Sequence, residues 1–117
     1  NPWTINSLAV IAGELMFTDQ EYIEKTRELI LAERKRIYKK FAESGMFKVY
    51  PPNANFLLAK ILKDDITSQD LFDRAIRRGM MIRDCSTFPF LDQKYIRFCF
   101  MMPEDNDRLS LCLLENL

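Results

Sequence analysis

The segment RRGMMIRDCSTFPFLDQKYIRFCF, residues 77–100, decides the fold because it contains two apolar runs separated by a polar loop. Residues 80–83 and residues 95–100 have the length and composition of short β-strands. The loop over residues 84–93 contains serine, threonine and proline, which are typical of irregular structure. Each strand also carries an arginine. Arg83 and Arg97 place charged groups in strands of a chain whose 17 basic and 17 acidic residues cancel.

Alternation along the second strand predicts where Arg97 points, because successive side chains lie on opposite faces. One face carries the apolar side chains Ile96, Phe98 and Phe100. If helices cover that face, Arg97 projects from the other one, where its planar fork suits bidentate binding of a carboxylate or phosphate. The pattern alone favours a simpler alternative, an arginine paired with a surface acid or with another arm of the same protein. It does so more strongly for Arg83, which lies beside Asp84.

The sequence around this segment alternates between helical and extended patterns. The expected order is a helix over residues 6–17, a long helix over 18–44, strands over 46–50 and 55–62, a helix between Thr67 and Gly79, the strands over 80–83 and 95–100, and a last helix from Pro103. Thr18 is expected to cap the long helix, with Glu21 completing a capping box. This order predicts an α+β fold in which helices cover a small, mostly antiparallel sheet.

Composition limits the classes of function. A chain of 117 residues fits one domain with a real core. Its balanced charge gives no case for nucleic acid or a membrane surface as partner. No apolar run approaches the roughly 20 residues that a transmembrane helix needs.

The residue types that are scarce also bear on chemistry. The chain has no histidine, which is the commonest metal ligand and the commonest general base, so neither a metal site nor a catalytic residue is expected on it. Its three glycines form no phosphate-binding loop. The three cysteines are widely spaced and are interpreted as reduced, mostly buried thiols of a cytoplasmic protein.

Four segments resemble, in the same order, the C-terminal part of fold-type-I pyridoxal-phosphate enzymes, in the group that contains histidinol-phosphate aminotransferase and threonine-phosphate decarboxylase. They are NPWTINSLAVIAGELM, VYPPNANFLL, RRGMMIRDCSTFPFLDQKYIR and PEDNDRL, which together cover nearly the whole chain. The first segment and the CSTFPFLD loop look closest to threonine-phosphate decarboxylase. Phe90 departs from the pattern, because the family usually has glycine there, and a different bend of the loop is expected.

The resemblance implies roles for both arginines. The family arginine matched by Arg97 holds the α-carboxylate of the substrate, and the one matched by Arg83 helps to hold its other anionic groups, including the phosphate. The implied substrate is a phosphorylated amino acid or amino alcohol that two guanidinium groups orient.

The resemblance also implies a domain organisation. Residues 1–17 correspond to an interface helix from a large domain, and residues 18–117 to the small C-terminal domain. Pyridoxal 5'-phosphate belongs to the large domain, and no lysine of this chain has the Ser/Thr-rich setting of the family's Schiff-base lysine. We therefore expect the chain alone to be inactive and not to bind the cofactor tightly, and we expect the intact enzyme to be a homodimer.

Three hypotheses follow. The first is the C-terminal domain of a pyridoxal-phosphate-dependent threonine-phosphate decarboxylase of cobalamin biosynthesis, and the second is the same domain of a histidinol-phosphate aminotransferase-like enzyme. The third is a stand-alone, non-catalytic α+β binding module. The sequence begins at Asn-Pro-Trp without methionine, so a processed or excised piece of a longer protein is expected.

Overall fold

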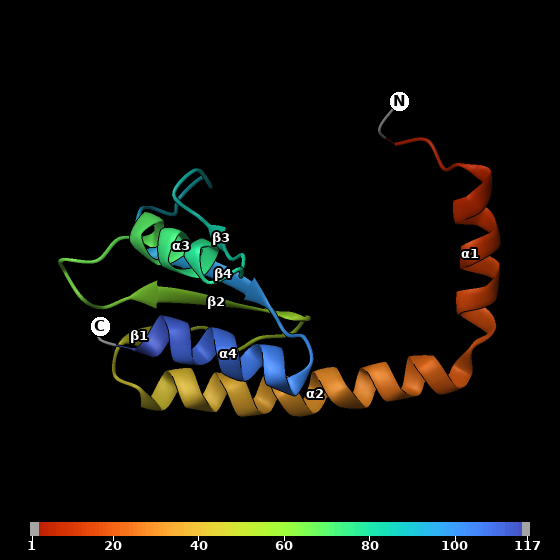
Figure 1. Cartoon of the computed structure of the whole chain (residues 1–117), viewed down its shortest axis with the longest axis horizontal. Helices are drawn as coiled ribbons and strands as arrows, with labels where there is room; N and C mark the ends of the chain where they lie inside the picture. The colour runs from red at the N-terminus through yellow and green to blue at the C-terminus, as the bar shows by residue number, and fades with distance from the viewer. Residues whose placement is uncertain (1–2, 116–117) are drawn as a thin grey trace.

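A computed structural model describes residues 3–115 and confirms the expected α+β fold class. The elements are α1 (Ser7–Thr18), α2 (Gln20–Glu43), β1 (Phe47–Val49), β2 (Phe56–Ile61), α3 (Ser68–Arg77), β3 (Arg83–Asp84), β4 (Tyr95–Cys99) and α4 (Pro103–Leu114). Figure 1 shows a layered body at one end of the long helix α2, while α1 stands at the other end, away from that body.

One antiparallel sheet with the strand order β1-β2-β4-β3 forms the centre of the body. Its register places Leu57 opposite Phe98 and Ala59 opposite Ile96, so the buried positions of β2 and β4 share one face. Helices α2, α3 and α4 cover this face and contribute side chains to the same core. The core residues from these helices include Ile37, Phe41, Leu71, Ala75, Leu109 and Leu113. In the part of the chain that the structure describes, the three helices that contribute to the core all lie on this one side of the sheet.

A buried polar network fixes the turn that follows β4. Glu33 of α2 is buried, and its carboxylate accepts hydrogen bonds from Arg36 at 2.7 Å and from the side-chain amide of Asn106 at 3.0 Å. Asn106 also bonds both backbone groups of Met101, at 2.8 and 2.9 Å. The hydrogen bond from Arg36 is the largest influence on Glu33 and lowers the pKa of its carboxyl below the ordinary value.

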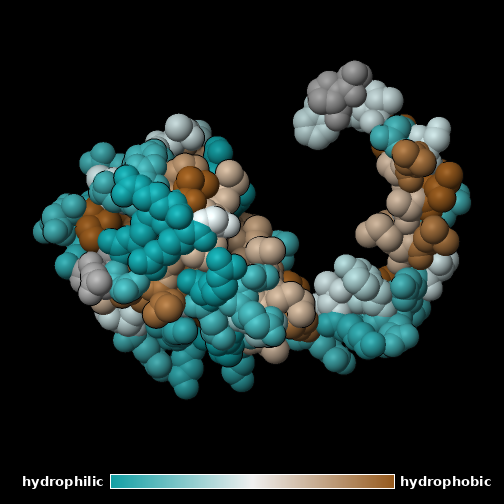
Figure 2. All heavy atoms as spheres, viewed as in Figure 1, coloured by the Kyte–Doolittle hydropathy of each residue, from teal (hydrophilic) through white to brown (hydrophobic). Residues whose placement is uncertain are grey.

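The N-terminal arm, which we define as residues 7–30, leaves most of its apolar side chains exposed. None of the residues of α1 is buried, and Leu15 is 67% exposed. Figure 2 shows brown, hydrophobic spheres along this helix. In α2, the buried residues are Glu33, Ile37 and Phe41, because the arm extends past the sheet. Among residues 3–115, no helix is both long and apolar enough to cross a membrane.

Two local predictions were wrong. Asp19, not Thr18, caps α2, because its carboxylate accepts a hydrogen bond from the Tyr22 amide at 3.1 Å. The Thr18 hydroxyl instead donates to two carbonyls at the end of α1. The strand expected over residues 80–83 is confined to Arg83–Asp84, because the amide of Met80 still bonds Ala75 at the end of α3.

Candidate functional site

The sheet register brings the two arginines of the opening segment together. Arg83 of β3 lies directly opposite Arg97 of β4. Residues opposite each other in an antiparallel pair project from the same face, with Cβ atoms about 4.5–5.5 Å apart. Ile96 and Phe98 point into the core, so Arg97 and its partner Arg83 project from the open face.

The part of the simpler alternative that pairs each arginine with a surface acid does not hold within residues 3–115. The ion pairs among residues 3–115 include neither Arg83 nor Arg97. Asp84 follows Arg83 but turns toward α3, where its carboxylate accepts hydrogen bonds from the Ser68 hydroxyl at 2.7 Å and the Ser86 amide at 2.9 Å. Burial opposes the charged form of Asp84, yet these hydrogen bonds outweigh it and lower the pKa of the carboxyl.

Aromatic rings, and not acids, contact the two guanidinium groups. The Cζ atom of Arg83 lies 5.0 Å from the centroid of the Phe88 ring. The Cζ atom of Arg97 lies 4.8 Å from the centroid of Phe56 and 5.8 Å from that of Phe88. A cation over a ring face is attracted to it within about 6 Å. Because such contacts use none of the N–H donors, those donors stay available to an anion.

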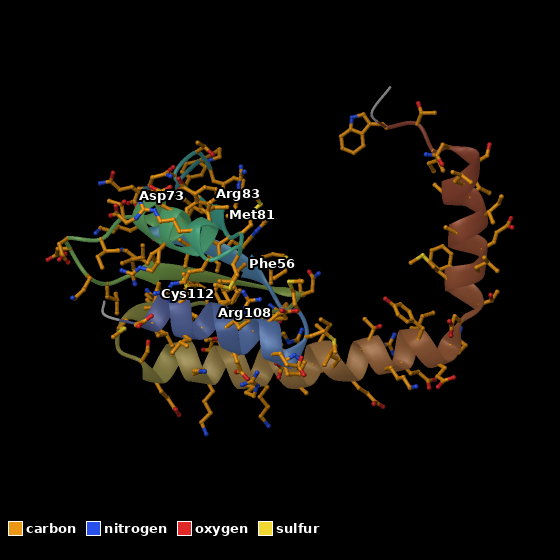
Figure 3. All side chains as sticks on the ribbon, in the orientation of Figure 1. Phe56, Asp73, Met81, Arg83, Arg108 and Cys112 are labelled. Atoms are coloured by element: carbon orange, nitrogen blue, oxygen red, sulfur yellow. The ribbon has the colours of Figure 1, made fainter. Side chains whose placement is uncertain are left out.

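Both arginines line one open hollow of about 680 Å³. Gln69, Thr87 and Met101 contribute to its walls. Figure 3 shows Arg83, Met81 and Phe56 at the same end of the sheet, the end nearer to α1. Ligand sites commonly have volumes of about 300–1,000 Å³, so the hollow is large enough for a small phosphorylated metabolite.

The loop over residues 85–94 holds Phe88 above the open face. The Leu91 amide donates to the carbonyl of Phe88 at 3.1 Å, which closes a turn over residues 88–91. Pro89 occupies its second position and Phe90, with a φ of 68°, its third, which is the pattern of a type II turn. Phe90 therefore adopts the left-handed conformation that glycine favours, although its side chain makes that conformation costly.

The cysteines do not form a nucleophilic centre. All three are free. Cys85 is buried beneath the loop, and burial raises the pKa of its thiol, which disfavours the reactive thiolate. Cys112 is also buried, whereas Cys99 is exposed.

No lysine lines the hollow that both arginines share. The Lys94 ammonium group is bound by three backbone carbonyls, at 2.6 to 2.8 Å. Lys48 and Lys60 lie over tyrosine rings in the sheet rows next to Arg97. The arrangement can therefore bind and orient anions, and no covalent step is assigned to it.

Sequence reasoning missed the two aromatic contacts of the arginines. Phe56 was part of an apolar strand, and Phe88 was one of two phenylalanines in a loop. The alternation of side chains along β2 was a usable signal. Leu57 and Ala59 point into the core, so Phe56 lies on the opposite face, which also carries Arg97.

Comparison with known proteins identifies the family. A family model for aminotransferases of class I and II matches residues 3–110. The chain belongs to the aminotransferase class I and II family. This membership confirms the resemblance found in the sequence, and the fold agrees with it.

Individual relatives include both kinds of enzyme. Threonine-phosphate decarboxylase from Salmonella typhimurium is 34% identical over 99% of this chain and 31% of its own length. A solved histidinol-phosphate aminotransferase from Clostridium acetobutylicum matches all of this chain and 36% of its own, with a TM-score of 0.84 and 31% identity. Another, from Sinorhizobium meliloti and in complex with pyridoxal-5'-phosphate, matches 83% of this chain and 26% of its own, with a TM-score of 0.67 and 28% identity. The chain thus spans about a third of the length of such enzymes.

Proposed function

We propose that this chain is the small, substrate-binding domain of a pyridoxal-phosphate-dependent L-threonine-O-3-phosphate decarboxylase that acts in cobalamin biosynthesis. The observation that carries the proposal is the pair of guanidinium groups of Arg83 and Arg97. They lie opposite each other on an open sheet face, and neither forms an ion pair with a carboxylate of residues 3–115; Asp84 lines the same hollow, but its carboxylate is hydrogen-bonded to Ser68 and Ser86. Two cations on one face that form no ion pair within the described chain suit a ligand with two negative groups.

Phosphothreonine has these two groups, and they are close together. Its carboxylate and its phosphate are separated only by Cα, Cβ and the ester oxygen. We assign the carboxylate to Arg97 and the phosphate to Arg83, in agreement with the resemblance. Bidentate contacts of this kind fix the orientation of a small ligand as well as its affinity. The role of these residues is therefore to hold the bonds of the substrate Cα in one orientation while the cofactor supplies the electron sink.

The second candidate is the same domain of a histidinol-phosphate aminotransferase. The similarity to the Clostridium acetobutylicum structure supports it. Histidinol phosphate has a phosphate but no carboxylate, so it would bind to one of the two guanidinium groups. The other guanidinium group would then bind a carboxylate of the amino-acid donor. The third hypothesis, a stand-alone module without chemistry, is disfavoured by the family to which the chain belongs.

The remaining parts of the enzyme are also proposals. We assign the cofactor and its lysine to a large domain, because no lysine is among the residues that line the hollow of Arg83 and Arg97. The exposed apolar residues of the N-terminal arm are the surface that we expect to pack on that domain, with residues 1–17 as its interface helix. A homodimer and a cytoplasmic location complete the proposal, and the three free thiols support the latter.

The test uses the full-length protein and two assays. Release of carbon dioxide from O-phospho-L-threonine identifies the decarboxylase, and turnover of histidinol phosphate that requires a keto acid identifies the aminotransferase. In the active assay, Arg97→Lys and Arg83→Lys should each lower kcat/KM by about 10- to 100-fold, because lysine keeps the charge but loses the bidentate fork. Arg108→Lys, at an exposed position on α4, is the matched control and should change kcat/KM by less than about twofold. Activity in neither assay, or equal effects of all three variants, would refute the proposal.

A further inference from the structure

Phe88 contacts both guanidinium groups of the candidate site and is the residue that connects them. Arg83 and Arg97 each lie within 6 Å of the centroid of its ring, whereas Phe56 contacts Arg97 alone. The three side chains come from three separate parts of the chain: β3, β4 and the loop over residues 85–94. A single half-buried ring therefore contacts two cations that form no ion pair within residues 3–115.

Two facing cations need such a contact because they repel each other. When no ligand is bound, this repulsion favours rotamers that hold the two guanidinium groups apart. A ring face attracts each cation without using its N–H donors. The contact therefore limits the directions that each flexible side chain adopts before an anion arrives, which lowers the ordering cost of binding.

The loop can hold Phe88 in place because its own backbone is fixed at several points. The Phe88 amide donates to the carbonyl of Cys85 at 3.1 Å, and its carbonyl accepts from Leu91. The Cys85 amide in turn bonds the carbonyl of Tyr95 in β4. The ring lies at a small hollow of about 220 Å³ that Phe56, Leu58, Leu91 and Arg97 also line.

We propose that Phe88 is a positioning residue for anion binding, which aligns the guanidinium groups of Arg83 and Arg97 for one doubly anionic ligand. This inference rests on the proposed function of the two arginines and extends it to a residue that touches neither substrate nor cofactor. It predicts that Phe88 acts on anion affinity only through the arginines.

The test measures the Kd of inorganic phosphate for the full-length enzyme loaded with its cofactor, followed by ³¹P NMR titration. Phosphate is the probe because its binding does not depend on which reaction the enzyme performs. Phe88→Leu keeps the apolar bulk in the loop but removes the ring, and we expect it to raise Kd about tenfold, equivalent to about 1.4 kcal/mol. Phe88→Tyr retains the ring and should stay within about twofold of the wild type. Phe90→Leu is the matched control, because Phe90 is fully exposed in the same loop, and it should leave Kd unchanged.

A double-mutant cycle separates positioning from a general effect on the loop. In an Arg83→Ala background one of the two guanidinium contacts of Phe88 is gone, so Phe88→Leu should raise Kd only about threefold. An unchanged Kd in Phe88→Leu, or the same tenfold effect in both backgrounds, would overturn the inference and leave the arginine site intact. If Arg83→Ala and Arg97→Ala both leave phosphate binding unchanged, the proposed site fails, and the role of Phe88 fails with it.

Discussion

Replacing Phe90 by glycine should stabilise the domain, because Phe90 combines a strained backbone with a side chain that contributes no burial. Its φ of 68° lies in the left-handed region, which costs a residue with a Cβ atom about 1–2 kcal/mol. Its side chain is 104% exposed, so no packing is lost on removal. Glycine relieves the strain but makes the unfolded chain more flexible, which takes back about 0.4–1 kcal/mol. Taking the middle of each range, the net gain in the free energy of unfolding is about 0.8 kcal/mol.

Urea unfolding at pH 7, followed by circular dichroism, measures this gain, and thermal unfolding should show a rise in Tm of about 2–4 °C. Phe90→Ala is the informative control, because it removes the ring but keeps the Cβ atom and hence the strain. The alanine variant should be no more stable than the wild type. A glycine variant that is as stable as the wild type or less so, or an alanine variant that matches the glycine gain, would show that the turn is not strained as described.

Three further changes test other parts of the fold. Glu33→Gln should lower the free energy of unfolding by about 1–3 kcal/mol at pH 7, because it removes the charge that Arg36 neutralises. Folding lowers the pKa of Glu33, so the stability that its carboxylate contributes is fully present above about pH 4.5. This contribution is lost as the pH falls through the folded pKa. Below the folded pKa, urea unfolding should give the same stability for the wild type and the variant. Gly79→Ala should cost about 1 kcal/mol from backbone strain alone, since its φ is 75° and no atom lies within 4 Å of an added Cβ atom; a neutral result in the same assay would contradict this. Thr67→Ala removes the hydroxyl that accepts from the Asp70 amide, while the backbone amide of residue 67 keeps its bond to the Asp70 carboxylate. The change should destabilise α3 by about 1 kcal/mol in chemical denaturation, and an unchanged midpoint would refute the cap.

The sheet and its buried face could be predicted from the sequence because they depend on short-range patterns. Alternation in YIRFCF placed Phe98 in the core and Arg97 on the other face, and Pro103 marked the first turn of α4. The helix that begins near Thr67 was expected to end at Gly79, which has a positive φ of 75°. These features need only local geometry and the requirement to bury apolar side chains.

The parts that sequence reasoning missed depend on contacts between distant segments. The pairing of Arg83 with Arg97 needs the register of β3 on β4, and the ring of Phe88 reaches both arginines only because a turn folds the loop back over the sheet. The competition between Thr18 and Asp19 as helix cap was decided by hydrogen bonds to the preceding helix. Neither the register nor this competition leaves a periodic signal in the sequence.

The central claim is that Arg83 and Arg97 bind different anionic groups of one substrate, the phosphate and the carboxylate. The most direct test compares kcat/KM for O-phospho-L-threonine and for unphosphorylated L-threonine in the full-length protein, in the wild type and in the variants Arg83→Ala and Arg97→Ala. If Arg83 holds the phosphate, Arg83→Ala should reduce the preference for the phosphorylated substrate by about tenfold or more. If Arg97 holds the carboxylate, Arg97→Ala should lower kcat/KM for both substrates by similar factors and leave the preference unchanged. An unaltered preference in Arg83→Ala, or a preference that collapses only in Arg97→Ala, would contradict this assignment of the site.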